Sequence, residues 1–150
     1  MSANSKRELL LETVRTALAD IEWVAKVERQ KLTIEELKNL ATTQLPYLGM
    51  VGSLPDPREN TRGGARSADS FISDLAITIV CYGTDNVNPD STISTYLDDL
   101  WRTLFALEYD RSLQVIKVDV QPTTQQANWK PYFAFVIKYV VTYAHDKGGI

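Results

Sequence analysis

The clearest strand pattern in the sequence is F-I-S-D-L-A-I-T-I-V-C-Y, residues 71–82. Successive side chains of a strand point to opposite faces of its sheet. One face of this segment is apolar and consists of Phe71, Leu75, Ile77, Ile79 and Cys81. The other face is mixed and carries Asp74, Ala76, Thr78 and Tyr82. The pattern therefore predicts a strand with one face in the core and one face turned away from it.

The chain after this strand predicts one long helix and two more strands. Over Pro89–Leu107, apolar residues recur at steps of three and four, which is the repeat of an amphipathic helix. Alternation predicts strands over Leu113–Gln121 and Tyr132–His145, and the turn-forming residues of Pro122–Pro131 separate them. The last strand has an apolar row formed by Phe133, Phe135, Ile137, Tyr139, Val141 and Tyr143. Its other face is mixed, with Ala134, Val136 and Val140 interrupted by Lys138 and Thr142.

The chain before this strand contains two helix signals. The segment Ser5–Ile21 begins with the S-x-x-E pattern of a capping box and continues with an apolar stripe at helical spacing. A second pattern of this kind begins a brief helix within Thr33–Gln44. Short strands are expected within Trp23–Leu32 and over Tyr47–Leu54.

These elements predict one α+β domain that spans residues 1–150. At 150 residues and 16.9 kDa the chain is long enough for one sizeable core and short for two domains. The pattern indicates a mainly antiparallel sheet with two long helices packed on one face, plus a short extra helix and a long polar loop. The second face of the sheet then leaves Val136 and Val140 under-covered, which is typical of an association surface.

The long polar loop, at 54–70, reads L-P-D-P-R-E-N-T-R-G-G-A-R-S-A-D-S. Structureless loops beyond about 12 to 15 residues in compact domains are usually functional or disordered. Arg58, Arg62 and Arg66 recur in it every four residues. They fit a solvated surface, a contact to protein or a contact to nucleic acid. Neighbouring acidic residues largely offset their charge, and the loop has no aromatic residue for base stacking.

The reactive side chains are too few and too scattered for the common kinds of active site. His145 and Cys81 are the only histidine and the only cysteine, so a zinc site with several such ligands cannot form. Asp85–Asp90 lacks the Gly and Glu positions of a calcium loop. Gly63–Gly64 lacks the Lys-Ser/Thr of a phosphate-binding loop. We predict no catalytic residue, no cofactor and no metal, and therefore a protein that is not an enzyme.

Composition argues against nucleic acid or a membrane as the main partner. The net charge of -3 and the pI near 5.2 give no general attraction to nucleic acid. The mean hydropathy is -0.20, and no apolar run approaches the roughly 20 residues that cross a bilayer. The first residues, M-S-A-N-S-K-R-E, lack the apolar core of a signal peptide, so we expect synthesis in the cytoplasm.

The layout resembles the tail terminator and tail-completion proteins of long-tailed bacteriophages. The similar features are the helix Ser5–Ile21 leading into a strand, Leu45-Pro46 before the next strand, the loop 54–70, the strand Phe71–Tyr82, the helix Pro89–Leu107 and the strand pair over 113–145. The resemblance covers nearly the whole chain and is one of architecture, without a diagnostic motif. The segment Thr33–Gln44 differs, because it is longer than the simple hairpin expected there.

The resemblance implies a structural virion protein, located in the tail or neck. Such a protein forms a homo-hexameric ring at the head-proximal end of the tail, ends polymerisation of the tail tube and joins the tail to the head connector. Its partners are other copies of itself, the tail tube protein and a connector or neck protein, with non-specific contact to passing DNA. The expected contact residues are Arg58, Arg62, Arg66, Val136 and Val140. Two alternatives stay open: another neck, connector or minor tail component, and a small cellular non-enzymatic binding module.

Overall fold

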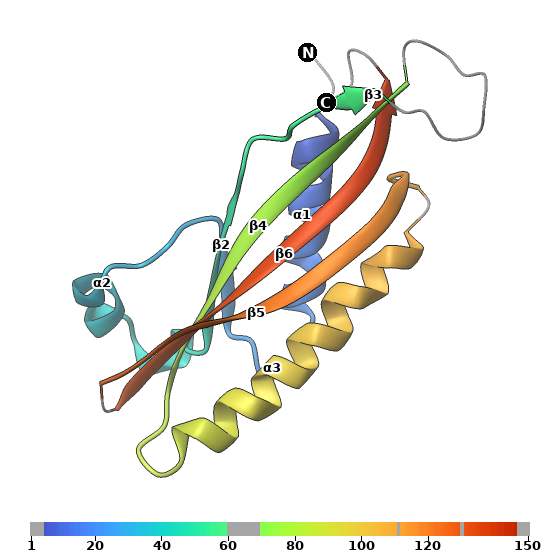
Figure 1. The fold of residues 1–150 in the computed structure, drawn as a ribbon. Coiled ribbons are helices and arrows are strands. Elements are labelled where there is room, and N and C mark those ends of the chain that lie inside the picture. The colour runs from blue at the N-terminus through green and yellow to red at the C-terminus, as the bar shows by residue number, and fades with distance from the viewer. Residues whose placement is uncertain (1–4, 60–69, 111, 130, 147–150) are drawn as a thin grey trace.

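The computed structural model describes residues 5–59, 70–110, 112–129 and 131–146 and shows an α+β fold (Figure 1). The strands are β1 (Lys26–Glu28), β2 (Tyr47–Gly52), β3 (Arg58–Glu59), β4 (Ser70–Thr84), β5 (Val115–Trp129) and β6 (Tyr132–Asp146). The helices are α1 (Lys6–Ala19), α2 (Ile34–Asn39) and α3 (Pro89–Ala106), with single-turn helices η1 (Thr42–Gln44) and η2 (Leu107–Tyr109). The sheet order is β1-β2-β4-β6-β5, and β3 pairs near the start of β4. β1 and β2 run parallel, and the other pairs are antiparallel.

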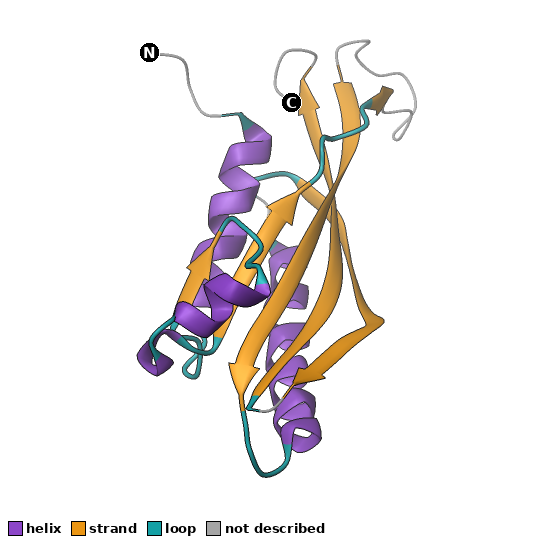
Figure 2. Cartoon of the chain, turned by 90° about the vertical axis from the view of Figure 1, so that its left-hand side faces the viewer, coloured by secondary structure: helices purple, strands orange, loops and turns teal. Residues whose placement is uncertain are grey.

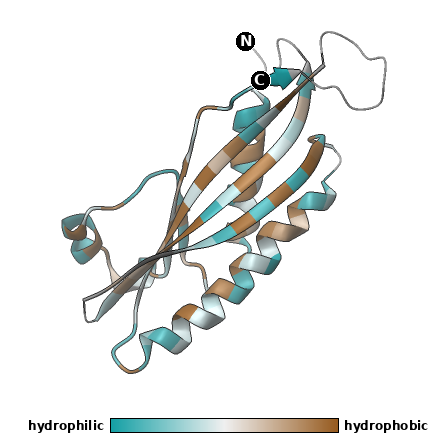
Figure 3. Ribbon diagram, viewed as in Figure 1, coloured by the Kyte–Doolittle hydropathy of each residue, from teal (hydrophilic) through white to brown (hydrophobic). Residues whose placement is uncertain are grey.

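The long strands β4 and β6 form the centre of the sheet. They pair along their whole length, from Ser70 opposite Asp146 to Thr84 opposite Tyr132. Residues directly opposite each other on paired strands share a face, so the apolar rows of both strands face the same core. The fully buried members include Leu75, Ile77, Ile79, Phe133, Ile137 and Tyr139. The alternation appears as bands of colour along these strands in Figure 3, and both predicted strands are confirmed.

Local signals in the sequence set the starts of the helices. The Ser5 hydroxyl accepts a hydrogen bond from the Glu8 N–H at 3.2 Å at the start of α1. Thr33 and Glu36 form a complete capping box at the start of α2. Pro89 lies in the first turn of α3, where its missing N–H needs no helical partner. The three helices predicted from these signals are therefore present.

Two apolar clusters lie on the two faces of the sheet. The main cluster joins the inward rows of the strands to Leu10, Leu11, Val14 and Leu18 of α1 and to Ile93, Leu100 and Leu104 of α3. The second cluster lies on the outer face and joins Leu37 of α2 to Tyr47, Val80 and Tyr82. Figure 2 shows α2 on the side nearest the viewer, separate from the two long helices.

Two segments between the first helix and β2 differ from the prediction. β1 has only three residues, because Trp23 leaves the strand and stacks on Tyr96 of α3 with ring centroids 3.8 Å apart. The Trp23 indole N–H also donates a hydrogen bond to Asp99 at 2.8 Å. The helix predicted within 33–44 ends at Asn39, because Leu40 adopts an extended conformation and packs against the second cluster.

The turn predicted over Pro122–Pro131 is wrong. β5 continues through this segment to Trp129 and pairs with β6, with a register shift between Pro122 and Gln126. β5 lies at the edge of the described sheet, where a proline costs no ladder hydrogen bond when its nitrogen faces outward. The long partner strand β6 therefore determines where β5 ends.

Only the outer parts of the predicted loop at 54–70 are described. Arg58 and Glu59 form β3, which pairs with Ile72 and Phe71, and Ser70 already belongs to β4. Residues 60–69, including the predicted contacts Arg62 and Arg66, lie outside the described residues.

Candidate interaction surface

The outer face of the sheet has a covered half and an open half. The covered half carries α2 and the second cluster. The open half consists of three cross-strand rows, Val51-Thr78-Lys138-Gln121, Ala76-Val140-Asp119 and Asp74-Thr142-Lys117. We call these residues, together with Arg58 of β3, the open face. All of their side chains are half-buried or exposed.

Asp74 is the polar centre of the open face. Its carboxylate accepts hydrogen bonds from the Thr142 hydroxyl at 2.6 Å and from the Arg58 guanidinium at 2.8 Å. Burial alone raises the pKa of a carboxyl group, but these contacts outweigh that effect and hold the pKa of Asp74 below its usual value. The ionised carboxylate thus links β3, β4 and β6 at one end of the sheet.

A hollow of about 330 Å³ lies on the open face beside Asp74. Its lining brings Lys117, Asp119 and Val140 next to the Asp74 network. The Gln121 amide donates a hydrogen bond to the Asp119 carboxylate at 2.5 Å. Ligand pockets are usually enclosed and mostly apolar, whereas protein interfaces mix polar and apolar groups. The lining of this hollow is therefore better suited to a protein partner than to a small ligand.

The open face carries three cations, Arg58, Lys117 and Lys138, and two carboxylates, Asp74 and Asp119, so its net charge is positive. Arg58 is paired with Asp74, whereas no ion pair joins either lysine to the described residues. Both lysines are exposed and lie on the neighbouring strands β5 and β6, with the row of Val140 and Asp119 between them. Their ammonium groups are available to carboxylates of a partner.

The contact residues predicted from the sequence do not all lie together. Arg58 and Val140 are on the open face. Val136 is in the covered half and packs against the second cluster, so it is partly covered, contrary to the expectation. Alternation places Asp74 on the outer face but gives no sign of its central position there. Its contact with Arg58 depends on the pairing of β3 with β4, which alternation alone does not show.

The only histidine lies in the core. The His145 ring nitrogen Nε2 and the Ser73 hydroxyl form a hydrogen bond at 2.6 Å, and the two side chains are 4% and 0% exposed. The ring also stacks on Phe71, with centroids 6.0 Å apart. A nucleophile and its base must be reached by the substrate, and this burial does not allow it.

Cys81 has the core role predicted for it. The side chain is 1% exposed and belongs to the main cluster. Burial raises the pKa of its thiol, which therefore stays protonated at neutral pH.

The acidic turn before α3 is stabilised by Asp85, and Asn88 caps the helix by accepting a hydrogen bond from the Ser91 N–H. The Asp85 carboxylate accepts the N–H groups of Val87 and Asn88 at 2.8 and 2.9 Å, and the Thr92 hydroxyl also donates to it. These hydrogen bonds, with that from Thr92 the strongest influence, lower the pKa of Asp85. The oxygens of Asp85 therefore hold the turn that leads into α3.

Among the described residues, no group of three or more His, Cys, Asp or Glu side chains is placed to hold a metal ion. None of the helices in the described ranges has the length and apolar character needed to cross a membrane.

The sequence was also compared with known proteins. No protein-family model matches the chain, and no curated protein matches it.

Proposed function

We propose that this chain is a structural virion protein that forms a homo-hexameric ring at the head-proximal end of a phage tail. In this role the ring ends polymerisation of the tail tube and joins the tail to the head connector. The open face is the observation that supports the proposal most. It is a regular sheet surface, and the second cluster does not extend over its residues Lys117, Lys138 and Val140. Exposed surfaces that mix apolar and polar groups in this way are typical of contacts between subunits.

The open face is smaller than a complete interface between subunits. Its longest row crosses four strands, about 14 Å at ~4.8 Å per strand spacing, and the three rows together extend about 14 Å along the strands. The area is therefore roughly 200 to 400 Å². Stable specific interfaces bury about 800 Å² on each partner. The open face is thus one part of a larger contact between subunits.

A ring of this kind would end tube growth by its shape. One surface of the ring binds the last layer of the tail tube protein. The opposite surface differs from it and binds the connector or neck protein, so no further tube subunit can add. Arg58, Arg62 and Arg66 are the proposed contacts of segment 54–70 to a neighbouring subunit, or non-specifically to DNA in the lumen.

Light scattering over a concentration series tests this proposal. A hexamer, or a hexamer that forms as the concentration rises, supports the ring. A monomer or dimer at every concentration overturns it and favours a cellular binding module.

A charge-reversal variant tests the role of segment 54–70. Arg62→Glu with Arg66→Glu is expected to weaken ring formation, because both arginines are proposed contacts. Lys31→Glu with Lys38→Glu is the matched control, because these exposed lysines lie outside the open face and the change of charge is the same. Ring formation by the arginine variant equal to that of the control would remove the loop from the contact.

A further inference from the structure

A second surface lies on the helix side of the sheet, between α1 and α3. It is a groove of about 590 Å³, and its lining includes Ala17, Asp20, Ile21, Glu22, Ala106 and Leu107. A further hollow of about 460 Å³ along α1 shares Ala17 and Asp20 with it and extends to Leu9. We call the first hollow the helix groove. It has an apolar part from both helices and an acidic part near the end of α1.

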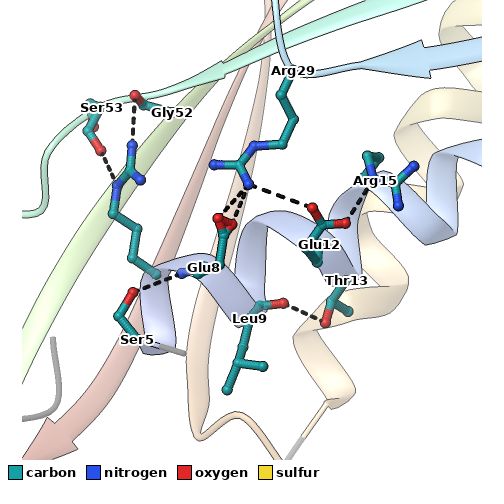
Figure 4. A network of polar contacts seen from close by, with 10 residues as sticks. Ser5, Glu8, Leu9, Glu12, Thr13, Arg15, Arg29, Gly52 and Ser53 are labelled. Carbon is teal, nitrogen blue, oxygen red and sulfur yellow. Dashed lines mark hydrogen bonds and ion pairs between the residues drawn. The ribbon is translucent and has the colours of Figure 1, made fainter. Parts of the chain in front are cut away.

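The charges in and near the helix groove are only partly compensated within the chain. On α1, Glu12 is bound by Arg15 at 2.7 Å and by Arg29 at 3.5 Å, as Figure 4 shows. In the groove itself, Asp99 accepts the hydrogen bond from Trp23. Asp20 and Glu22 differ, since no ion pair or side-chain hydrogen bond joins either carboxylate to the described residues.

Arg102 adds little positive charge to the groove. Its guanidinium is paired with Asp98 at 3.1 Å on the exposed side of α3. The helix groove therefore presents two free carboxylates beside an apolar strip.

The open face has the complementary character. Lys117 and Lys138 are its two ammonium groups without an ion pair to the described chain, and Val51, Ala76 and Val140 are its apolar residues. These lysines are opposite in charge to Asp20 and Glu22 of the helix groove, although the open face also carries Asp119, whose carboxylate has a hydrogen bond from Gln121 and no ion pair to the described residues. Complementary charges at the edge of a contact mainly set orientation and association rate, while the apolar groups supply affinity.

The two surfaces lie on opposite faces of the sheet. The helix groove is formed by α1 and α3, whose buried residues belong to the main cluster, whereas the open face consists of the outward positions of the strands. A two-fold dimer uses the same patch on both subunits, so it cannot bring a surface on one side and a surface on the other into one contact. Each subunit must use them toward two different neighbours. Such a head-to-tail contact gives a closed ring or an open filament.

We propose that the helix groove of one copy receives the open face of the next copy. This inference rests on the proposed ring and names the two surfaces that form its repeated contact. Asp20 and Glu22 of one subunit lie against Lys117 and Lys138 of its neighbour. Ala17, Ile21 and Leu107 face Val51 and Val140.

Two opposite charge reversals and their mixture test the contact. One variant carries Asp20→Lys with Glu22→Lys, and the other carries Lys117→Glu with Lys138→Glu. In each variant alone the two surfaces have the same sign, so assembly measured by light scattering is expected to weaken by more than about tenfold in concentration. Mixed in equal amounts, the variants can alternate around an even-numbered ring, and every contact again joins opposite charges. The mixture is expected to assemble as the wild type does.

Controls separate this inference from the proposed function. Circular dichroism and thermal unfolding show whether each variant is folded, and Lys31→Glu with Lys38→Glu reports the effect of the same change of net charge as in the variant of Lys117 and Lys138. If the wild type forms hexamers and both reversals also do so, the contact is overturned and the ring stands. Loss of assembly in the separate variants with no recovery in the mixture also overturns the contact. A wild type that stays monomeric overturns the contact and the ring together.

Discussion

At the residue scale, the contacts made in the fold explain two residues, Gly49 and Asp74, whose roles are ambiguous in the sequence. Gly49 looks like a weakness in a predicted strand, since glycine is depleted in strands. In the structure a side chain at this position would overlap the backbone carbonyl of Gln30. Asp74 looks like an ordinary outward residue, yet it joins Arg58 and Thr142. Both roles depend on partners that are distant in sequence or brought close by folding.

Gly49→Ala should destabilise the protein by about 2 kcal/mol or more, because the backbone of Gln30 has to move to admit the methyl group. Gly52→Ala is the matched variant on the same strand. Its methyl group would contact the end of the flexible Leu11 side chain, so a smaller loss is expected. Urea unfolding of both variants measures the difference, and equal losses would contradict this account of Gly49.

Asp74→Asn should make stability less dependent on pH in acid. The pKa of Asp74 in the folded protein is lowered, so its ionised form contributes stability above the unfolded pKa of about 3.9. That contribution is lost as the pH falls through the folded value. The Asp74 and Arg58 side chains are 42% and 53% exposed, so the effect at pH 7 should stay below about 1 kcal/mol. The free energy of unfolding, measured at pH 7 and pH 3, should differ less between wild type and variant at pH 3. The same difference at both pH values would contradict this role of the ionised Asp74.

At the element scale, the long central strands and the two long helices could be predicted from the sequence, whereas the end of the edge strand β5 could not. The alternation of β4 and β6 and the caps of the helices depend on residues that are close in sequence. The elements β4, β6, α1 and α3 could therefore be predicted closely. The end of β5 could not, because its polar residues after Pro122 show no alternation and are held by pairing with β6. Dependence on partners distant in sequence also limits how well the interaction surface could be predicted. Alternation places Val140 on the outer face, but only the position of α2 shows that Val136 is partly covered there.

Leu37→Ala should loosen α2 from the sheet. Leu37 is fully buried in the second cluster, and its truncation should cost about 2 to 4 kcal/mol. Ile34→Ala on the same helix is the control, because Ile34 is 57% exposed and should change stability by less than about 0.5 kcal/mol. Thermal unfolding compares the two variants. Binding of an apolar dye by the Leu37 variant alone would show that the covered half has opened, and identical behaviour of both would contradict the role of α2 as a cover.

At the scale of the whole molecule, the two sides of the sheet differ in chemistry. The helix side has an acidic groove with an apolar part, and the outer side has an open face with free lysines. A subunit with two different surfaces on opposite sides is suited to head-to-tail assembly. This difference between the sides is the physical basis for the proposed ring.

Electron microscopy of the purified wild-type protein tests the ring most directly. If the protein forms the proposed ring, the images will show closed rings with six-fold symmetry and a central hole wide enough for duplex DNA. Single particles or two-fold dimers at every concentration at which light scattering is measured would contradict it.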